Sequence, residues 1–165
     1  MFHIRPATAA DCHQLAAIER AAGELFPPGR IPDRQQTTSM EALTASLNAN
    51  MLLVAAEEHE SVGFAMSHAI ENYLHLQELS EHPLHARQGI GRALVVQVQN
   101  LAKSFGLQGV SLTTFSDLPW NGPFYQSAGF SPSANPPPHI TKALEEEQSL
   151  GMVARIGMLW ETLRA

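Results

Sequence analysis

The chain has 165 residues, of which 44% are hydrophobic, and its formal net charge at pH 7 is −6. This length predicts one domain, residues 1–165, with a core of its own, and the charge argues against nucleic acid as the main partner. No apolar stretch approaches the ~20 residues of a membrane span, and Cys12, the one cysteine, has no partner for an internal disulfide. Because the N-terminus also lacks the apolar run of a secretory signal, we expect a cytoplasmic protein without membrane contacts.

Hydrophobic periodicity predicts helices and strands that are intermixed along the chain. In chain order the predicted elements are a strand at 2–6, a helix that follows a capping box at 8–11 and ends near Gly23, a helix that opens at 38–41 and ends near 48–50, strands at 51–56, 61–70 and 74–81, a long helix at 90–105, a strand at 110–115, a short helix at 124–128 and a strand at 155–160. The strand–turn–helix–strand unit at 74–115 predicts a parallel pair, whereas the preceding meander is antiparallel, so we expect a mixed sheet.

Three segments leave their structure or role open. The proline-containing segment 27–32 cannot be regular, and it fits a binding loop or an exposed connector equally well. The proline-rich segment 131–139 is predicted to be irregular. Residues 140–150, which include three consecutive glutamates, fit either a helix or an ordered loop.

The turn at 87–92, Arg-Gln-Gly-Ile-Gly-Arg, is the strongest candidate for a binding site. Its glycines let the backbone approach a ligand closely, and the helix that follows offers free N–H groups and a positive dipole end, which suit a phosphate or pyrophosphate. Arg87 and Arg92 can add charge-assisted contacts. The alternative is that the glycines only relieve steric crowding between a strand and a helix. The apolar stripe that predicts the helix is Ile90, Leu94, Val98, Leu101 and Phe105.

Three motifs, in this order, resemble those of GNAT-superfamily N-acetyltransferases over nearly the whole chain. Residues 4–7, followed by Asp11, are similar to the family's opening strand and helix. Residues 82–91 resemble its acyl-CoA pyrophosphate loop, Q/R-x-x-G-x-G/A, with Ala86 where the family usually has Gln or Arg. Residues 124–130 resemble its later Y-x-x-x-G-F signature.

The resemblance implies an α/β (α+β) fold with a mixed, mostly antiparallel central sheet, helices on both faces and a splayed parallel strand pair. It also implies acetyl-CoA as co-substrate and direct transfer of the acetyl group to a primary amine in a ternary complex. The family often has Asn seven residues before its tyrosine, where this chain has Leu118, and Asn121 lies four residues before Tyr125. By this resemblance, the residues that bind acetyl-CoA are Leu79, Ser80, Glu81, Arg87, Gln88, Gly89, Ile90, Gly91, Arg92, Asn121 and Tyr125.

Two side chains are the candidate catalytic residues. An ammonium must lose a proton before its nitrogen attacks a thioester, and Glu78 is the candidate base. Strand alternation places Glu78 on the same face as Leu74 and Leu76, where desolvation would raise its pKa; the alternative is a structural or solvated carboxylate. Tyr125 is the candidate acid for the departing thiolate, the role of the matching tyrosine in the family, and the alternative is a tyrosine that only packs over the cofactor.

Other polar side chains have weaker claims. His75 is expected on the opposite strand face from Glu78 and becomes a second relay only if a β-bulge changes the alternation. The eight histidines show no convincing ligand spacing, so no metal is expected. Cys12 is expected to be a packed thiol. Glu19, Glu24 and Arg30 are candidates to line the acceptor site, but an ordinary solvated surface is the preferred interpretation of these residues. Trp120 either shapes the acceptor pocket or only wedges its loop.

The sequence leaves the identity of the amine open, and two alternatives to N-acetyl transfer remain. One is a non-catalytic acyl-CoA-binding or regulatory domain with the same fold, and the other is a different acyl donor. Negative charge is compatible with a cationic or amine substrate, either a small molecule or a peptide. A homodimer is a further expectation, because the apolar strand 156–160 and the proline-rich segment could pair across a two-fold axis.

Overall fold

The computed structural model describes residues 1–162 and divides into two compact units. The first unit consists of residues 1–68 and 76–98. The second consists of residues 69–75 and the described residues from 99 onward. Strand β4 (Tyr73–Glu81) contributes its first three residues to the second unit and the rest to the first.

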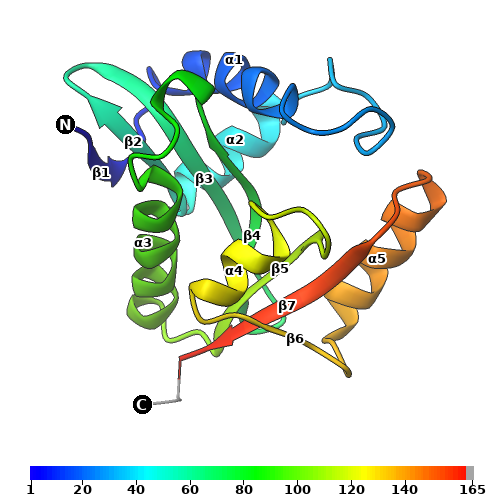
Figure 1. Ribbon diagram of the computed structural model, residues 1–165. Coiled ribbons are helices and arrows are strands. Elements are labelled where there is room, and N and C mark those ends of the chain that lie inside the picture. The colour runs from blue at the N-terminus through cyan, green and yellow to red at the C-terminus, as the bar shows by residue number, and fades with distance from the viewer. Residues whose placement is uncertain (163–165) are drawn as a thin grey trace. The chain divides into compact units, whose positions relative to one another are not determined.

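Within residues 1–162 the chain forms a mixed, mostly antiparallel sheet and five α-helices (Figure 1). The strands are β1 (His3–Pro6), β2 (Leu52–Glu57), β3 (Glu60–Ile70), β4 (Tyr73–Glu81), β5 (Gly109–Phe115), β6 (Ser131–Pro132) and β7 (Arg155–Glu161), in the order β1-β2-β3-β4-β5-β7-β6. The helices are α1 (Cys12–Gly23), α2 (Met40–Asn48), α3 (Ile90–Ser104), α4 (Gly122–Ser127) and α5 (Pro138–Ser149), with a 3-10 helix η1 (Pro83–His85). The β4–β5 pair is parallel, as predicted.

Helices cover both faces of the strands in the first unit. Phe64 of β3 belongs to a buried cluster with apolar side chains of α1, α2 and β2. Its neighbour Gly63 points to the other face, because successive strand residues alternate. There a Cβ on Gly63 would lie 2.9 Å from Ile90 Cγ2, so only glycine leaves room for the first residue of α3. The sheet thereby fixes where α3 begins.

An ion pair joins β1 to the start of α1 in the first unit. The Asp11 carboxylate accepts hydrogen bonds from both terminal nitrogens of Arg5, at 2.7 and 2.9 Å, and from the N–H of Thr8 at 2.7 Å. The Arg5 guanidinium is the main reason that the pKa of Asp11 lies far below its usual range. The bond from Thr8 to Asp11 is one that the predicted capping box requires, but α1 begins at Cys12 with Asp11 as its N-cap, so Thr8 does not cap the helix. At the start of α2, the Ser39 side chain accepts a hydrogen bond from the N–H of Ala42 and so caps the helix.

The second unit is built on the antiparallel pair β5–β7, with β6 on the other side of β7. Two glycines allow close approaches. A Cβ on Gly109 would lie 1.9 Å from the Trp160 carbonyl oxygen, and one on Gly157 would lie 2.4 Å from Ile140 Cγ2. Ile140 is fully buried, so α5 packs tightly against β7 at this point.

The structure corrects the sequence predictions at a few places. Segment 131–139 is not wholly irregular, because Ser131–Pro132 pairs with β7 and α5 begins at Pro138. Segment 140–150 is helical up to Ser149. The predicted stripe on α3 fails at Phe105, which lies beyond the helix and is 44% exposed. The stripe ends instead on Ala102, which is fully buried.

None of the helices in residues 1–162 combines the length and the apolar character that crossing a membrane requires.

Candidate active site

The predicted binding turn lies between β4 and α3 in the first unit. It passes through η1, where the His82 side chain accepts a hydrogen bond from the N–H of Leu84. Two residues then adopt left-handed backbone conformations, Arg87 with φ 65° and Gly89 with φ 82°. A Cβ built on Gly89 has no atom within 4 Å, so the surface beside this residue is open. The turn therefore offers accessible backbone directly before a helix.

The start of α3 is rigidly placed. Ile90 is fully buried, and it is seated against Gly63 of β3. The first N–H groups of a helix have no partners within the helix, and they lie at the positive end of its dipole. Arg87 and Arg92 are exposed on either side of this helix end. This arrangement suits a diphosphate group.

The carboxylate of Glu81 also lies at this helix end. Glu81 Oε2 accepts a hydrogen bond from the N–H of Gly91 at 3.2 Å. Burial raises the pKa of Glu81, and the hydrogen bond from Gly91 opposes this rise only in part. The family resemblance predicts that Glu81 contacts the cofactor. In the structure, its side chain accepts a hydrogen bond from Gly91, one of the N–H groups at the helix end.

The candidate base lies on the same strand. Glu78 is half-buried, and its Oε1 accepts a hydrogen bond from the Ser80 hydroxyl at 2.8 Å. Ser80 is only 5% exposed. Leu79, between them, is half-buried. The last four residues of β4 and the turn 87–92 belong to the same unit, and the hydrogen bond from Gly91 to Glu81 joins them.

Tyr125 and Asn121 lie together in the second unit, on and just before α4. Tyr125 is 7% exposed, and its ring makes edge contacts with those of Phe124 and Phe130. The N–H of Tyr125 donates to the Asn121 carbonyl at 2.9 Å. Among the described residues, the side-chain oxygen of Asn121 is buried and has no hydrogen-bond partner. An unsatisfied buried acceptor of this kind is costly, so a ligand that donates a hydrogen bond would stabilise this segment.

These features test whether a coenzyme with a diphosphate fits the chain. In the first unit, the open backbone at Gly89 and the fixed helix end fit such a group. The Glu81 carboxylate weakens the fit when it is charged, because it takes the Gly91 amide. The turn 87–92 therefore fits a diphosphate best when Glu81 is protonated.

Comparison with known proteins identifies the family. The family model described as "Acetyltransferase (GNAT) domain" matches residues 48–132, just over half of the chain. The chain belongs to the GNAT acetyltransferase family. The matched region contains the turn 87–92, Asn121 and Tyr125.

Solved structures share the GNAT fold over nearly the full chain. The PaiA N-acetyltransferase from Thermoplasma acidophilum, in complex with coenzyme A, is 17% identical with a TM-score of 0.75, and the match covers 98% of this chain and 99% of that one. The ribosomal-protein-S18-alanine N-acetyltransferase from Escherichia coli is 18% identical with a TM-score of 0.72, covering 100% and 96%. YncA, a putative acetyltransferase from Salmonella typhimurium with acetyl-CoA, is 19% identical with a TM-score of 0.70, covering 99% and 95%.

This GNAT chain also contains a hydrogen-bonded cluster that the sequence analysis missed. In the second unit, His75 of β4, Ser111 of β5 and His139 of α5 form a chain that ends on Glu71, in the turn before β4. Only His75 was considered beforehand. Glu71 and His75 are near each other in sequence, but Ser111 and His139 are far from both and no motif links the four, so local pattern gave no signal for the cluster.

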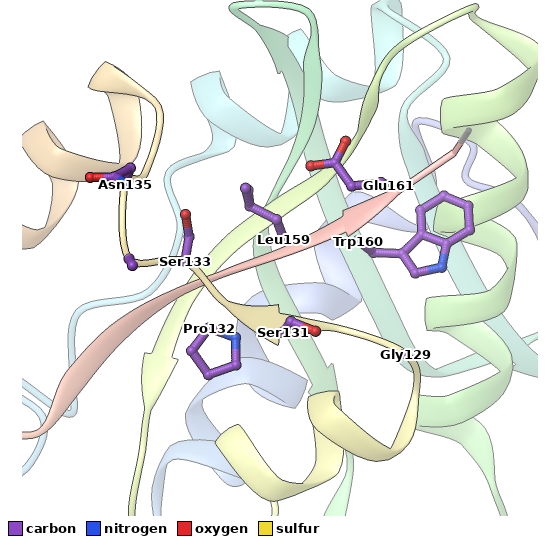
Figure 2. A pocket seen from close by; sticks show the side chains of 9 residues that line it. Gly129, Ser131, Pro132, Ser133, Asn135, Leu159, Trp160 and Glu161 are labelled. Carbon is purple, nitrogen blue, oxygen red and sulfur yellow. The ribbon is translucent and has the colours of Figure 1, made fainter. Parts of the chain in front are cut away.

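A surface cavity of about 510 Å³ lies in the second unit of this GNAT protein (Figure 2). Its walls are the segment 129–135 and the end of β7, and Glu161 is its one acidic lining residue. The Glu161 carboxylate accepts a hydrogen bond from the Tyr73 hydroxyl at 3.1 Å. Neither Glu78 nor Tyr125 lines this cavity.

The remaining candidates are accounted for mainly by structural contacts. Both carboxylate oxygens of Glu19 accept from the N–H of Thr38, which ties the long loop to α1. Glu24 and Trp120 are exposed. Cys12 is 3% exposed, and burial raises the pKa of its thiol, as expected of a packed cysteine. Within residues 1–162, no three His, Cys, Asp or Glu side chains are grouped as metal ligands.

Proposed function

We propose that this protein transfers an acetyl group from acetyl-CoA to a primary amine by direct attack in a ternary complex. The observation that carries the proposal is the turn 87–92, where open backbone at Gly89 leads into a helix end that is fixed by Ile90. Membership of the GNAT acetyltransferase family supports acetyl transfer. Two of the structures similar to this chain were solved with coenzyme A or acetyl-CoA.

The binding roles follow from the chemistry of these groups. Backbone N–H groups from Arg87 to Arg92 hold the diphosphate of the coenzyme, with the two arginine side chains adding positive charge. The backbone of Leu79 and Glu81 pairs with the pantetheine amides as an added strand would. The side-chain oxygen of Asn121 accepts a hydrogen bond from the coenzyme, which satisfies a buried acceptor. The Gly91 N–H becomes available to the diphosphate only when the Glu81 side chain releases it.

The transfer needs a base and an acid. The Glu78 carboxylate takes a proton from the ammonium group, and the neutral nitrogen then attacks the thioester carbon. The new C–N bond forms as the C–S bond breaks, the Tyr125 hydroxyl donates its proton to the departing thiolate, and the second proton of the attacking nitrogen returns the tyrosine to its neutral form. The Ser80 hydroxyl holds the Glu78 side chain in place. Contacts with the rings of Phe124 and Phe130 hold the Tyr125 ring, and its hydroxyl is the proposed proton donor.

A thiol-release assay tests the proposal. Purified protein, acetyl-CoA and a panel of polyamines, amino acids, peptides and aminoglycosides should give free thiol in proportion to the amine. Reactions without amine separate transfer from hydrolysis of the thioester. Calorimetry with CoA measures binding independently of chemistry. Binding without thiol release for any amine would contradict the proposal and support a non-catalytic acyl-CoA-binding domain.

Several expectations from the sequence stay predictions. They are a single domain at residues 1–165, a cytoplasmic location and a homodimer. The choice of a primary amine as acceptor also remains a proposal. The similar Escherichia coli protein is named for the alanine of ribosomal protein S18, whereas the name of the similar Thermoplasma acidophilum protein gives no acceptor.

A further inference from the structure

The surface cavity of the second unit lies where β7 extends beyond its short neighbour β6 (Figure 2). The β6 pairing ends at Leu159, two residues before the end of β7 at Glu161. Before β6 the chain turns at Gly129, which has φ 97°, and a Cβ there would lie 3.3 Å from Trp160 Cδ1. The segment 129–135 and the end of β7 thus border a space of about 510 Å³, which is within the size range of small-molecule sites.

One carboxylate lines the cavity, and the fold holds it in place. The Glu161 backbone is opposite Gly109 in the register of β5 and β7, and the N–H of Thr162 donates to the Gln108 carbonyl at 2.9 Å. The Glu161 side chain accepts hydrogen bonds from the Tyr73 hydroxyl at 3.1 Å and from the Gln108 amide at 3.5 Å. Neighbouring segments therefore position both its backbone and its side chain, so a ligand would meet a carboxylate that is already oriented.

The contacts of this carboxylate leave its charge unneutralised. Its two partners, Tyr73 and Gln108, are neutral donors, and burial, together with the Glu161 charge, raises the pKa of Tyr73. Lys103 lies 5.6 Å from the centre of the Trp160 ring, but strand alternation places that ring on the other face of β7 from Glu161. Among the described residues, no cation forms an ion pair with Glu161. The cavity therefore has a negative charge that a cationic ligand can neutralise.

The other walls of the cavity present hydrogen-bond acceptors beside apolar surface. Ser131, Ser133 and Asn135 line the side opposite the end of β7, and their side-chain oxygens can accept hydrogen bonds. Leu159 adds hydrocarbon to the cavity wall. Figure 2 shows the side chains of Ser133, Leu159 and Glu161 extending on the same side of β7. A ligand in this space thus meets a carboxylate, neutral oxygens and an apolar side chain together.

These groups select ligands by charge. The carboxylate would repel an anion, and the described lining contains no lysine, arginine or histidine to hold one. A neutral alcohol could donate to an oxygen, but it would leave the Glu161 charge unpaired. A primary ammonium carries several N–H donors, and its hydrogen bonds to a carboxylate are roughly twice as strong as neutral ones. An alkyl chain on the same ligand would remove the apolar surface of Leu159 from water.

We propose that this cavity binds an aliphatic primary amine, with the ammonium group on Glu161 and the alkyl chain along Leu159. The neighbouring hydroxyl oxygens accept the other N–H groups of the ligand. The inference goes beyond the proposed acetyl transfer, since neither Glu78 nor Tyr125 lines the cavity. Binding forms no covalent bond and needs no coenzyme, so it can be measured on the protein alone.

Hexylamine is the probe, and hexan-1-ol is its uncharged counterpart of the same length. NMR titration at pH 7, where the amine is protonated, both measures Kd and locates the site. Hexylamine should give saturable shifts in the backbone amides of Ser131, Ser133 and Leu159. Hexan-1-ol should bind about tenfold more weakly, which is the typical difference between a hydrogen bond to a charged group and one between neutral groups.

Glu161→Gln tests the carboxylate, because glutamine keeps an acceptor for the Tyr73 hydroxyl and removes the charge. It should weaken hexylamine binding about tenfold. Glu145→Gln, an exposed residue of α5, is the control for an equal change in net charge and should leave Kd unchanged. Ser133→Val replaces an acceptor in the wall with methyl groups and should also weaken binding, which gives a second test if Glu161→Gln does not fold.

Several results would overturn the amine site. They are equal Kd values for hexylamine and hexan-1-ol, equal Kd values for the wild type and either cavity variant, and saturable shifts confined to residues outside 129–135 and 159–161. Hexylamine that binds at the proposed acetyl acceptor would give shifts elsewhere and would be insensitive to Glu161→Gln. A protein that releases no thiol with any amine would overturn the proposed function and leave the outcome of this titration unchanged.

Discussion

Glu81→Gln is expected to tighten the binding of CoA. In the structure the Glu81 carboxylate accepts from the Gly91 N–H at 3.2 Å, at the helix end proposed to hold the diphosphate. A charged carboxylate there competes for the amide and repels phosphate. Glutamine has the same shape and keeps an oxygen that accepts from Gly91, but it carries no charge. The substitution therefore isolates the electrostatic effect.

The size of this effect follows from the spacing of the amides. Neighbouring amides in one helical turn lie within about 5 Å of each other, so a bound phosphate would lie about 5 Å from the carboxylate. At an effective permittivity of about 20, two unit charges at this distance repel by about 3 kcal/mol. Because Glu81 is only half-buried, solvent screening reduces this to about 1–2 kcal/mol. The Kd for CoA should fall about 5- to 30-fold.

The pKa of Glu81 fixes the sign of the pH dependence. Burial raises this pKa, so the carboxyl is neutral at low pH and becomes charged as pH rises through the raised value. Wild-type affinity for CoA should therefore fall over that interval, whereas Glu81→Gln should stay flat by comparison. By the same linkage, the protonated Glu81 favours folding and this contribution is lost as pH rises, so Glu81→Gln should not destabilise the fold.

Calorimetric titration with CoA across this pH interval makes the measurement. Glu41→Gln, an exposed residue of α2, is the control for an equal change in net charge. Titration of the coenzyme's own phosphate changes the Kd of both variants equally, so the ratio of the two Kd values does not depend on it. Equal Kd values for wild type, Glu81→Gln and Glu41→Gln at every pH would refute the placement of the diphosphate at this helix end.

Three other substitutions give separate tests. Tyr125→Phe keeps the ring packing and should lower kcat with little change in Kd for CoA; unchanged turnover at saturating substrates would remove its acid role. Glu78→Gln should lower the rate by about 10²–10⁴, most strongly at low pH, and an unaltered pH–rate profile would exclude it as the base. Asp11→Asn should cost about 2–4 kcal/mol of unfolding free energy, because it leaves a half-buried Arg5 guanidinium with a weaker partner. The pKa of Asp11 is depressed, so this difference should be present above about pH 4, the ordinary carboxyl pKa, and vanish as pH falls; equal urea midpoints at pH 7 would contradict it.

Local pattern was enough to predict most elements of the fold. The stripe Ile90, Leu94 and Val98 has the period of a helix, and those three side chains are buried. Turns between elements were also predictable, because they depend on residues a few positions apart. The mixed sheet with one parallel pair followed from the order of these elements. The turn 87–92 was predicted for the same reason, since glycine spacing and a following helix are both local signals.

The chemistry between distant segments was decided by tertiary structure alone. Glu81 reaches the Gly91 amide only because Ile90 fits over Gly63 and sets the start of α3 beside the end of β4. Glu71 and His139 are 68 positions apart and meet only through the packing of α5. Strand pairing and helix docking choose such partners by shape and burial, which depend on the whole core. A sequence pattern indicates which residues share one face of a helix or strand. It does not indicate which other element that face will contact.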